Sequence, residues 1–204
     1  MALISVSNNA LSNISVLPDA IPTGALVLLS TQTASSSASL SFTSGIDSTY
    51  DSYVFKFINI HPSVDAAEFT FQVDTGTNTN YNQTMTTTHF RAFHNEADTA
   101  TSLGYVSDSD QAQGTSFQRI IREIGADNDQ SGSGTLQLFN PSSSVFVKHF
   151  IARGNDSSSA SGVDYSIDNY TAGYINTTTP ITRVQFKMSS GNIDDGIIKM
   201  YGVK

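Results

Sequence analysis

The stretches YVFKFINI at residues 53–60 and AEFTFQVD at residues 67–74 decide the fold class. Successive side chains of a β-strand point to opposite faces, so every second residue lies on the same face. In both stretches large apolar residues occupy alternate positions, namely Tyr53, Phe55 and Phe57 in the first and Phe69, Phe71 and Val73 in the second. Each stretch therefore predicts a strand with one buried face.

Similar short segments continue along the chain from Gly24 to the C-terminus. GALVLLS at 24–30 is an apolar run that predicts a buried strand. Further strands are expected at 38–44, 89–94, 134–140, 145–152, 170–176, 182–188 and 196–203. The turn residues between them are mainly Gly, Ser, Asn, Asp and Pro.

One segment, FQRIIREIG at 117–125, is ambiguous. Its apolar residues Phe117, Ile120, Ile121 and Ile124 also fit one face of a helix. We assign it as a strand, with the helix as the alternative. With about ten short strands and no long helix, the sequence predicts an all-β protein, an antiparallel β-sandwich of the jelly-roll type.

The chain divides into an N-terminal arm at 1–22 and a jelly-roll domain at 23–204. The arm carries large apolar residues among Ser and Asn, and Pro18 and Pro22 close it. Seven apolar side chains are more than a free tail needs, so we expect the arm to order against a partner. The expected virion-attachment residues are Leu3, Ile4, Val6, Leu11, Ile14, Val16 and Leu17.

Composition restricts the classes of function. The net charge is -8, which disfavours contact with nucleic-acid phosphates. The absence of cysteine excludes disulfides and thiolate chemistry. No stretch reaches the ~18 to 20 apolar residues of a membrane span, and the first residues do not form a signal peptide. We expect assembly in a host cytoplasm, with no nucleic acid or membrane insertion.

Three polar segments, 74–82, 106–116 and 153–169, are predicted to be long loops. Tyrosines in or next to these segments, Tyr81, Tyr105 and Tyr165, are the candidate ligand-facing residues, and their rings would stack on sugars of a host surface glycan. The alternative is that each tyrosine is partly buried at a sheet end.

No motif for catalysis, cofactor binding or a metal ion stands out. DNDQSG at 127–132 begins like a calcium loop, but Leu138 occupies the position where that motif requires Glu. His89 and His94 are five residues apart, which places them on opposite faces of a strand. We therefore expect no enzyme activity, no catalytic or metal-binding residue and no cofactor, with a calcium ion at 127–132 left open.

Three stretches together resemble small tail-fibre-like virion proteins of tailed bacteriophages of aquatic bacteria. They are residues 21–62, SGTLQLFNPSSSVFVKHFIA at 133–152, and ITRVQFKMSSGNIDDGIIKMYGVK at 181–204. The resemblance implies a multimeric jelly-roll component of the virion, held to the particle by its N-terminal arm. A homo-oligomer, a trimer by analogy, and contacts with other virion proteins are expected.

Three functions remain open at this point. The first is a tail-fibre or tail-adaptor protein that docks by its arm and presents the sandwich outward. The second is a capsid decoration, or cement, protein that uses the same arm. The third is a carbohydrate-binding module, for which an exposed aromatic platform is expected.

Overall fold

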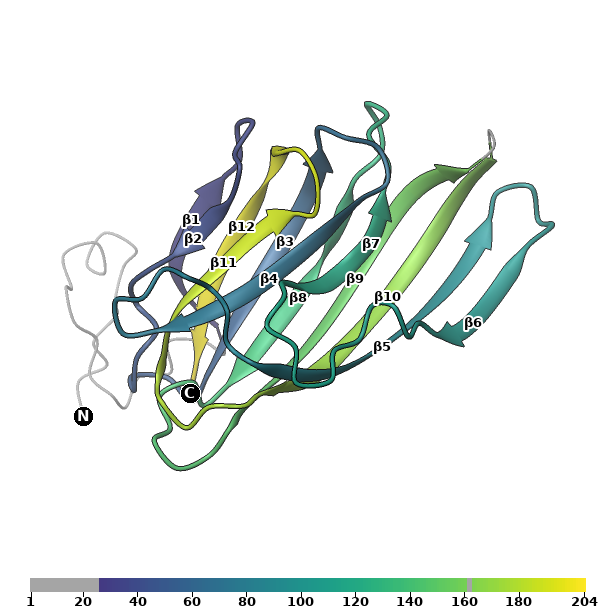
Figure 1. Cartoon of the computed structure of the whole chain (residues 1–204). Coiled ribbons are helices and arrows are strands. Elements are labelled where there is room, and N and C mark those ends of the chain that lie inside the picture. Colours follow the sequence, from purple (N-terminus) through teal and green to yellow (C-terminus); the bar gives the residue numbers. More distant parts are fainter. Residues whose placement is uncertain (1–25, 161–162) are drawn as a thin grey trace, which may run out of the picture.

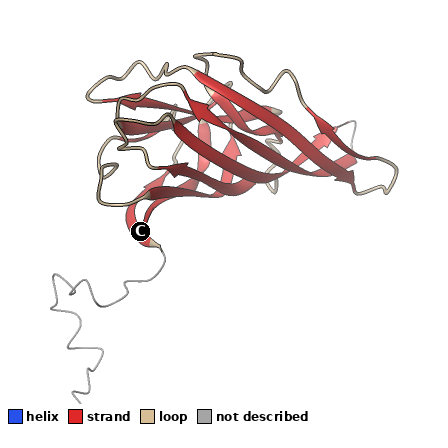
Figure 2. Ribbon diagram, turned by 90° about the horizontal axis from the view of Figure 1, so that it is seen from below, coloured by secondary structure: helices blue, strands red, loops and turns tan. Residues whose placement is uncertain are grey.

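The computed structural model describes residues 26–160 and 163–204, and all regular structure in them is β-strand. Figure 2 shows these strands joined by loops and turns. The strands are β1 (Val27–Thr33), β2 (Leu40–Phe42), β3 (Ser52–Pro62), β4 (Ala67–Thr75), β5 (Met85–Asn95), β6 (Thr101–Tyr105), β7 (Gln118–Ile124), β8 (Gly132–Phe139), β9 (Lys148–Ala160), β10 (Val163–Ile175), β11 (Ile181–Met188) and β12 (Ile193–Val203).

The strands form two antiparallel sheets of unequal size (Figure 1). The large sheet has eight strands in the order β1-β12-β3-β8-β9-β10-β5-β6, and the small sheet has four in the order β2-β11-β4-β7. The inner faces of both sheets contribute to one apolar core. The predicted all-β, antiparallel sandwich is thus confirmed.

The two sheets make a sandwich in which one sheet is extended, and the jelly-roll connectivity stays a prediction. Eight strands pack as β1-β12-β3-β8 in one sheet and β2-β11-β4-β7 in the other, with the chain crossing repeatedly between them. A jelly roll likewise arranges eight strands in two facing sheets. The remaining strands, β9, β10, β5 and β6, extend the large sheet beyond β8.

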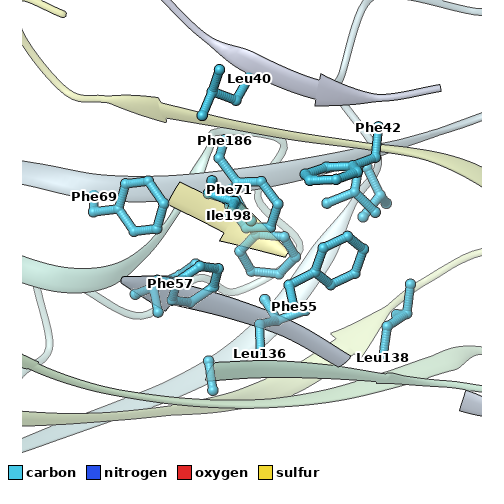
Figure 3. Close-up of a cluster of buried hydrophobic side chains, with 14 of the residues drawn as sticks. Leu40, Phe42, Phe55, Phe57, Phe69, Phe71, Leu136, Leu138, Phe186 and Ile198 are labelled. Atoms are coloured by element: carbon cyan, nitrogen blue, oxygen red, sulfur yellow. The ribbon is translucent and has the colours of Figure 1, made fainter. Parts of the chain in front are cut away.

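Phenylalanine rings fill the space where the two sheets overlap (Figure 3). Phe186 of β11 lies at the centre of this cluster, and its ring centroid is 5.3 to 6.4 Å from those of five other rings. Two of these partners belong to the opposite sheet, because Phe55 and Phe57 come from β3. The other three are Phe42, Phe69 and Phe71. Phe186 therefore holds the sheets together.

The ambiguous segment is a strand, β7, and its helix-like spacing has a physical cause. Ala67 of β4 pairs with Ile124, and Phe69 pairs with Ile121, so two residues of β7 lie opposite one residue of β4. A second irregularity follows between Phe69 and Thr70. Each bulge inserts a residue and resets the alternation of the strand. Apolar residues can then face the core at irregular intervals.

The prediction of a loop at 153–169 is wrong. This segment forms most of the long hairpin that β9 and β10 make together. Its Ser, Asn and Asp residues resemble a loop composition. They are tolerated in strands here because one face meets solvent, and on the other face the buried Asp156 and Asn169 are hydrogen-bonded to each other. Pairing with β8 on one side and β5 on the other holds the backbone in the sheet.

Other predictions need smaller corrections. β1 is an edge strand without buried residues rather than a buried one, since only β12 pairs with it. β6 was not predicted, because its residues are all exposed and carry no alternating burial signal. Residues 145–147 precede β9 and form part of a loop. The predicted loops at 74–82 and 106–116 are confirmed apart from the last residues of β4.

The predicted attachment arm at 1–22 lies outside the described residues. Its seven apolar residues, Leu3, Ile4, Val6, Leu11, Ile14, Val16 and Leu17, therefore keep their role as a prediction from sequence.

The variant Phe186→Ala tests the central role of this ring. Removing a buried Phe side chain costs about 3 to 5 kcal/mol of unfolding free energy, because burial is lost and a cavity remains. Urea unfolding followed by circular dichroism measures the change. Phe146→Ala is the matched control, since this ring is exposed and its loss is expected to change stability by less than about 0.5 kcal/mol. Equal effects of the two variants would contradict the assignment.

Candidate functional site

The large sheet extends beyond the small one, and this overhang creates the candidate site. β7 is the edge strand of the small sheet, and it contacts β9 and β10. The next strands of the large sheet, β5 and β6, lie past that edge (Figure 1). The loop after β6 returns along β5, where Thr87 N–H donates to Gln111 O and Val106 N–H donates to His89 O, both at 2.9 Å.

Four buried side chains form a polar layer under the edge of β7: Asp156 of β9, Asn169 and Thr171 of β10, and His89 of β5. Asn169 Nδ2 donates to Asp156 Oδ1 at 2.8 Å. His89 Nδ1 lies 2.8 Å from Thr171 Oγ1, which in turn donates to Arg119 O of β7 at 3.2 Å. This polar layer therefore continues across to the small sheet.

Burial changes the protonation of two groups in the polar layer. It raises the pKa of Asp156 to about 8, and the nearby Glu123 carboxylate adds to this effect while the hydrogen bond from Asn169 opposes it. Burial and the neighbouring arginines lower the pKa of His89 to about 4. At neutral pH both groups are uncharged, so this inner wall carries no net charge.

Three atoms of the polar layer lack a hydrogen-bond partner among the described residues: Asp156 Oδ2, Asn169 Oδ1 and His89 Nε2. Such atoms are expensive to bury. The Asp156 carboxyl is only 1% exposed, so a ligand in the overhang does not reach it directly. The protonated Asp156 carboxyl instead keeps the wall behind the site uncharged and contributes to its shape.

Charged side chains stand in front of the polar layer. Arg91 Nη1 donates to Glu123 Oε2 at 2.8 Å, and Arg122 Nε lies 3.1 Å from Glu123 Oε1. The Arg122 guanidinium also donates two hydrogen bonds to the Asp108 carboxylate, at 2.9 and 3.0 Å. Two arginines are thus balanced by two carboxylates.

The bulge in β7 places Glu123 in this position. Arg122 and Glu123 are the two residues that lie opposite Glu68 alone, and Glu123 has a φ of 62°. This left-handed backbone conformation is strained in any residue other than Gly, and such strain often occurs at functional positions. A regular strand would direct successive side chains to opposite faces, whereas here both contribute to the same ion-pair network.

Aromatic rings complete the site. Phe93 of β5 packs against Tyr165 of β10 with ring centroids 5.7 Å apart and planes at 68°, and the Arg91 guanidinium lies 5.8 Å from the Phe93 centroid. A hollow of about 180 Å³ is lined by Arg91, Phe93, Glu123, Ser158, Tyr165 and Ile167. We call this hollow, together with its polar and aromatic rim, the overhang cleft.

A second hollow, of about 230 Å³, adjoins the first. The two share Arg91 and Phe93, and the second extends toward Ser102 and Gly104 of β6. Since β5 lies between β10 and β6, the hollows lie on either side of Phe93.

The three tyrosines predicted to face ligands lie in different surroundings. Tyr81 is buried, and its N–H donates to Asp74 Oδ2 at 2.9 Å. Tyr105 is exposed at the end of β6, and its hydroxyl donates to Asp110. Tyr165 belongs to strand β10 rather than to a loop. The structure brings Tyr105 and Tyr165 to neighbouring hollows, while Tyr81 lies inside the fold.

Sequence reasoning missed the principal residues of the site: His89, Arg91, Phe93, Glu123, Asp156 and Asn169. A signal existed in HFRAFH, where His89, Arg91 and Phe93 alternate and so share a face. Polar and charged residues on the inward face of a strand indicate a surface that the apolar core does not cover.

The suggested calcium loop is a turn, in which Gln130 N–H donates to Asp127 O at 2.9 Å. Within residues 26–160 and 163–204, no group of three or more His, Asp or Glu side chains is placed to hold a metal ion. A search of the same residues found no helix of the length and apolar character that a membrane crossing requires.

A second surface of interest is the outer, solvent-facing side of the large sheet. Four large side chains of β5, β6 and β9 are exposed there: Phe90, Leu103, Tyr105 and Ile151, with Leu103 at 72% and Ile151 at 57%. Phe90 stacks on Tyr170, with centroids 4.7 Å apart. We call these residues the outer patch.

Comparison with known protein families, characterised protein sequences and solved structures found no match to this chain.

The protonated Asp156 predicts a specific pH dependence. Below about pH 4 the carboxyl is protonated in both the folded and the unfolded chain. Between about pH 4 and pH 8 only the folded chain keeps the proton, so the contribution of Asp156 to the free energy of unfolding falls as the pH rises. Asp156→Asn removes this contribution, and we expect it to gain stability relative to the wild type across that window, by on the order of a few kcal/mol at pH 8.

Urea unfolding at pH 4, 6 and 8 measures the difference. The control is Asp168→Asn, because hydrogen bonds from Arg153 lower the pKa of Asp168. That carboxylate stabilises the fold above pH 4, so its variant is expected to be less stable than the wild type at pH 6 and 8. If the Asp156 variant followed the wild type in parallel from pH 4 to 8, the carboxyl would not be protonated in the fold.

Proposed function

We propose that this chain is a structural protein of a bacteriophage virion, of the tail-fibre or tail-adaptor kind. The resemblance of 21–62, 133–152 and 181–204 to such proteins supplies the setting. The observation that carries the proposal is an apolar loop exposed at the end of the sandwich where the described chain begins and ends.

Strand pairing locates that end. Val27, at the start of β1, pairs with Gly202 near the end of β12, and Val203 pairs with Ser52. Ser52 also pairs with Phe139, the last residue of β8, so the loop 140–147 leaves the sheet at the same end. Figure 1 shows this loop beside the C-terminus. We call this region the terminal end.

The loop 140–147 holds its shape while exposing two large apolar side chains, Val145 at 70% and Phe146 at 68%. Their backbone N–H groups donate to Ser143 Oγ. Lys148 is fully buried, and its ammonium donates to Phe146 O at 3.0 Å and Thr177 O at 3.1 Å. An ordered, exposed apolar loop is typical of a surface that meets another protein.

The opposite end of the sandwich is polar. The last residues of β9 and the first residues of β10 lie there, and a hollow of about 340 Å³ is lined by polar residues that include Glu96, Asp129 and Asp164. The proposed orientation therefore places the terminal end, with the arm at 1–22, against the particle and the polar end outward.

A capsid decoration protein is the alternative within this class, because it would dock through the same end. A carbohydrate-binding module is the further alternative, and the aromatic and charged residues of the overhang cleft favour it.

The double variant Val145→Ser/Phe146→Ser is expected to lose incorporation into particles while keeping its stability, since both side chains are exposed. Particles assembled with the variant in place of the natural chain are purified on a density gradient and probed with antibody. Val64→Ser is the matched control, because Val64 is an exposed valine in the turn after β3, at the polar end. Full incorporation of the double variant would contradict docking through the terminal end.

Immunogold labelling of intact particles tests the location. The antibody is raised against the whole recombinant chain, because a tag on Lys204 would lie at the docking end. Label at the tail supports the tail-adaptor role, and label over the capsid supports the decoration alternative. Particles without label would reject the virion proposal.

The outer patch is expected to pack against a second copy of the chain. Several large apolar side chains exposed on one face of a sheet are a surface that homo-oligomers commonly bury. Leu103→Lys and Ile151→Lys are each expected to convert an oligomer into monomers in analytical ultracentrifugation. Ile58→Lys on β3 is the control, because it introduces the same charge on the outer face beyond β8. A wild-type chain that sediments as a monomer would contradict the assembly.

A further inference from the structure

We propose that the overhang cleft binds a neutral saccharide, with sugar rings on either side of Phe93. This inference does not depend on the virion role, and either one can fail without the other. It rests on three features of the cleft: its aromatic surface, its balanced charges and its pair of adjoining hollows.

Phe93 and Tyr165 form the aromatic surface of the cleft. Phe93 and Tyr165 meet at a steep angle, so they form a corner rather than a flat wall. Both rings are only half buried. The faces of a sugar ring that carry C–H groups pack well on such apolar surfaces, whereas its hydroxyls require polar partners at the rim.

The polar rim matches hydroxyl groups. Among the described residues, the Arg91 side chain makes one hydrogen bond, to Glu123, although a guanidinium carries five N–H donors. Glu123 is partly exposed and has spare acceptor capacity, and Ser158 adds a hydroxyl to the lining. Adjacent donors and acceptors are suited to the neighbouring hydroxyls of a sugar.

The charge balance selects a neutral ligand. Arg91 and Arg122 are paired with Glu123 and Asp108 before any ligand arrives. Behind them the polar layer is uncharged at neutral pH, because Asp156 holds its proton and His89 does not. A charged ligand would therefore lose its hydration without gaining an unpaired counter-charge.

The size of the site fits a short saccharide. The two hollows, of about 180 and 230 Å³, together fall within the range of roughly 300 to 1,000 Å³ that is usual for small-ligand sites. Because they share Arg91 and Phe93, a linked pair of rings can lie across β5 with one ring in each hollow.

The test is titration of the full-length, isotope-labelled chain with neutral trisaccharides, namely maltotriose, cellotriose, mannotriose, galactotriose and N,N′,N″-triacetylchitotriose. Binding of at least one of them is expected with a Kd of about 0.1 to 1 mM. The amide signals of Arg91, Phe93, Ser102 and Gly104 are expected to shift. Trigalacturonic acid is the charged comparison and is expected not to bind.

Two variants locate the site. Phe93→Ala is expected to weaken binding roughly tenfold through loss of the aromatic surface. Glu123→Gln keeps the side-chain shape but replaces carboxylate oxygens by a neutral amide, which accepts weaker hydrogen bonds from sugar hydroxyls, so it is also expected to weaken neutral sugar binding. Urea unfolding confirms that each variant folds, and Glu123→Gln remains informative if Phe93→Ala does not. Tyr174→Ala on the outer face of β10 is the control and should bind normally.

Several outcomes would overturn the proposal. One is that none of the five neutral trisaccharides binds the wild-type chain. Another is that binding survives in both cleft variants, or is lost only in Tyr174→Ala, which would place the site elsewhere. Binding of trigalacturonic acid alone would contradict the neutral class.

Discussion

The packing of phenylalanine rings around Phe186 is the contact on which the rest of the structure depends. Phe186 belongs to β11, an inner strand of the small sheet, and it meets rings from β2, β4 and the opposite β3. Facing sheets of a sandwich require such interdigitating side chains to exclude water between them. Because the small sheet has four strands and the large sheet eight, this apolar contact extends over only part of the large sheet.

The unequal sheets explain where the polar residues lie. The inner faces of β9, β10 and β5 meet the edge of β7, and there His89, Asp156 and Asn169 are buried beside the apolar core. Their uncharged forms reduce the desolvation cost of burial. Farther out, β5 and β6 have no strand of the small sheet opposite them, and the bulged β7 supplies Glu123 to their margin. The overhang cleft is therefore a direct consequence of the unequal sheets.

The surfaces proposed for docking and for ligand binding are well separated. The apolar loop with Val145 and Phe146 lies at the terminal end, whereas the overhang cleft lies along β5, toward the opposite edge of the large sheet from β1 and β12. A chain attached through its terminal end would keep the cleft accessible. Docking and saccharide binding are thus physically compatible on one molecule.

The sequence by itself determined the fold class, because the alternation in 53–60 and 67–74 is a local property of a strand. The polar hairpin of β9 and β10, the exposed β6 and the buried Tyr81 were not predictable in this way. Their environments depend on which strands become neighbours, and the chain brings these together from distant positions. Arg91 and Glu123 meet for the same reason: 32 residues separate them, and only the pairing of strands and the bulge in β7 bring their charges together.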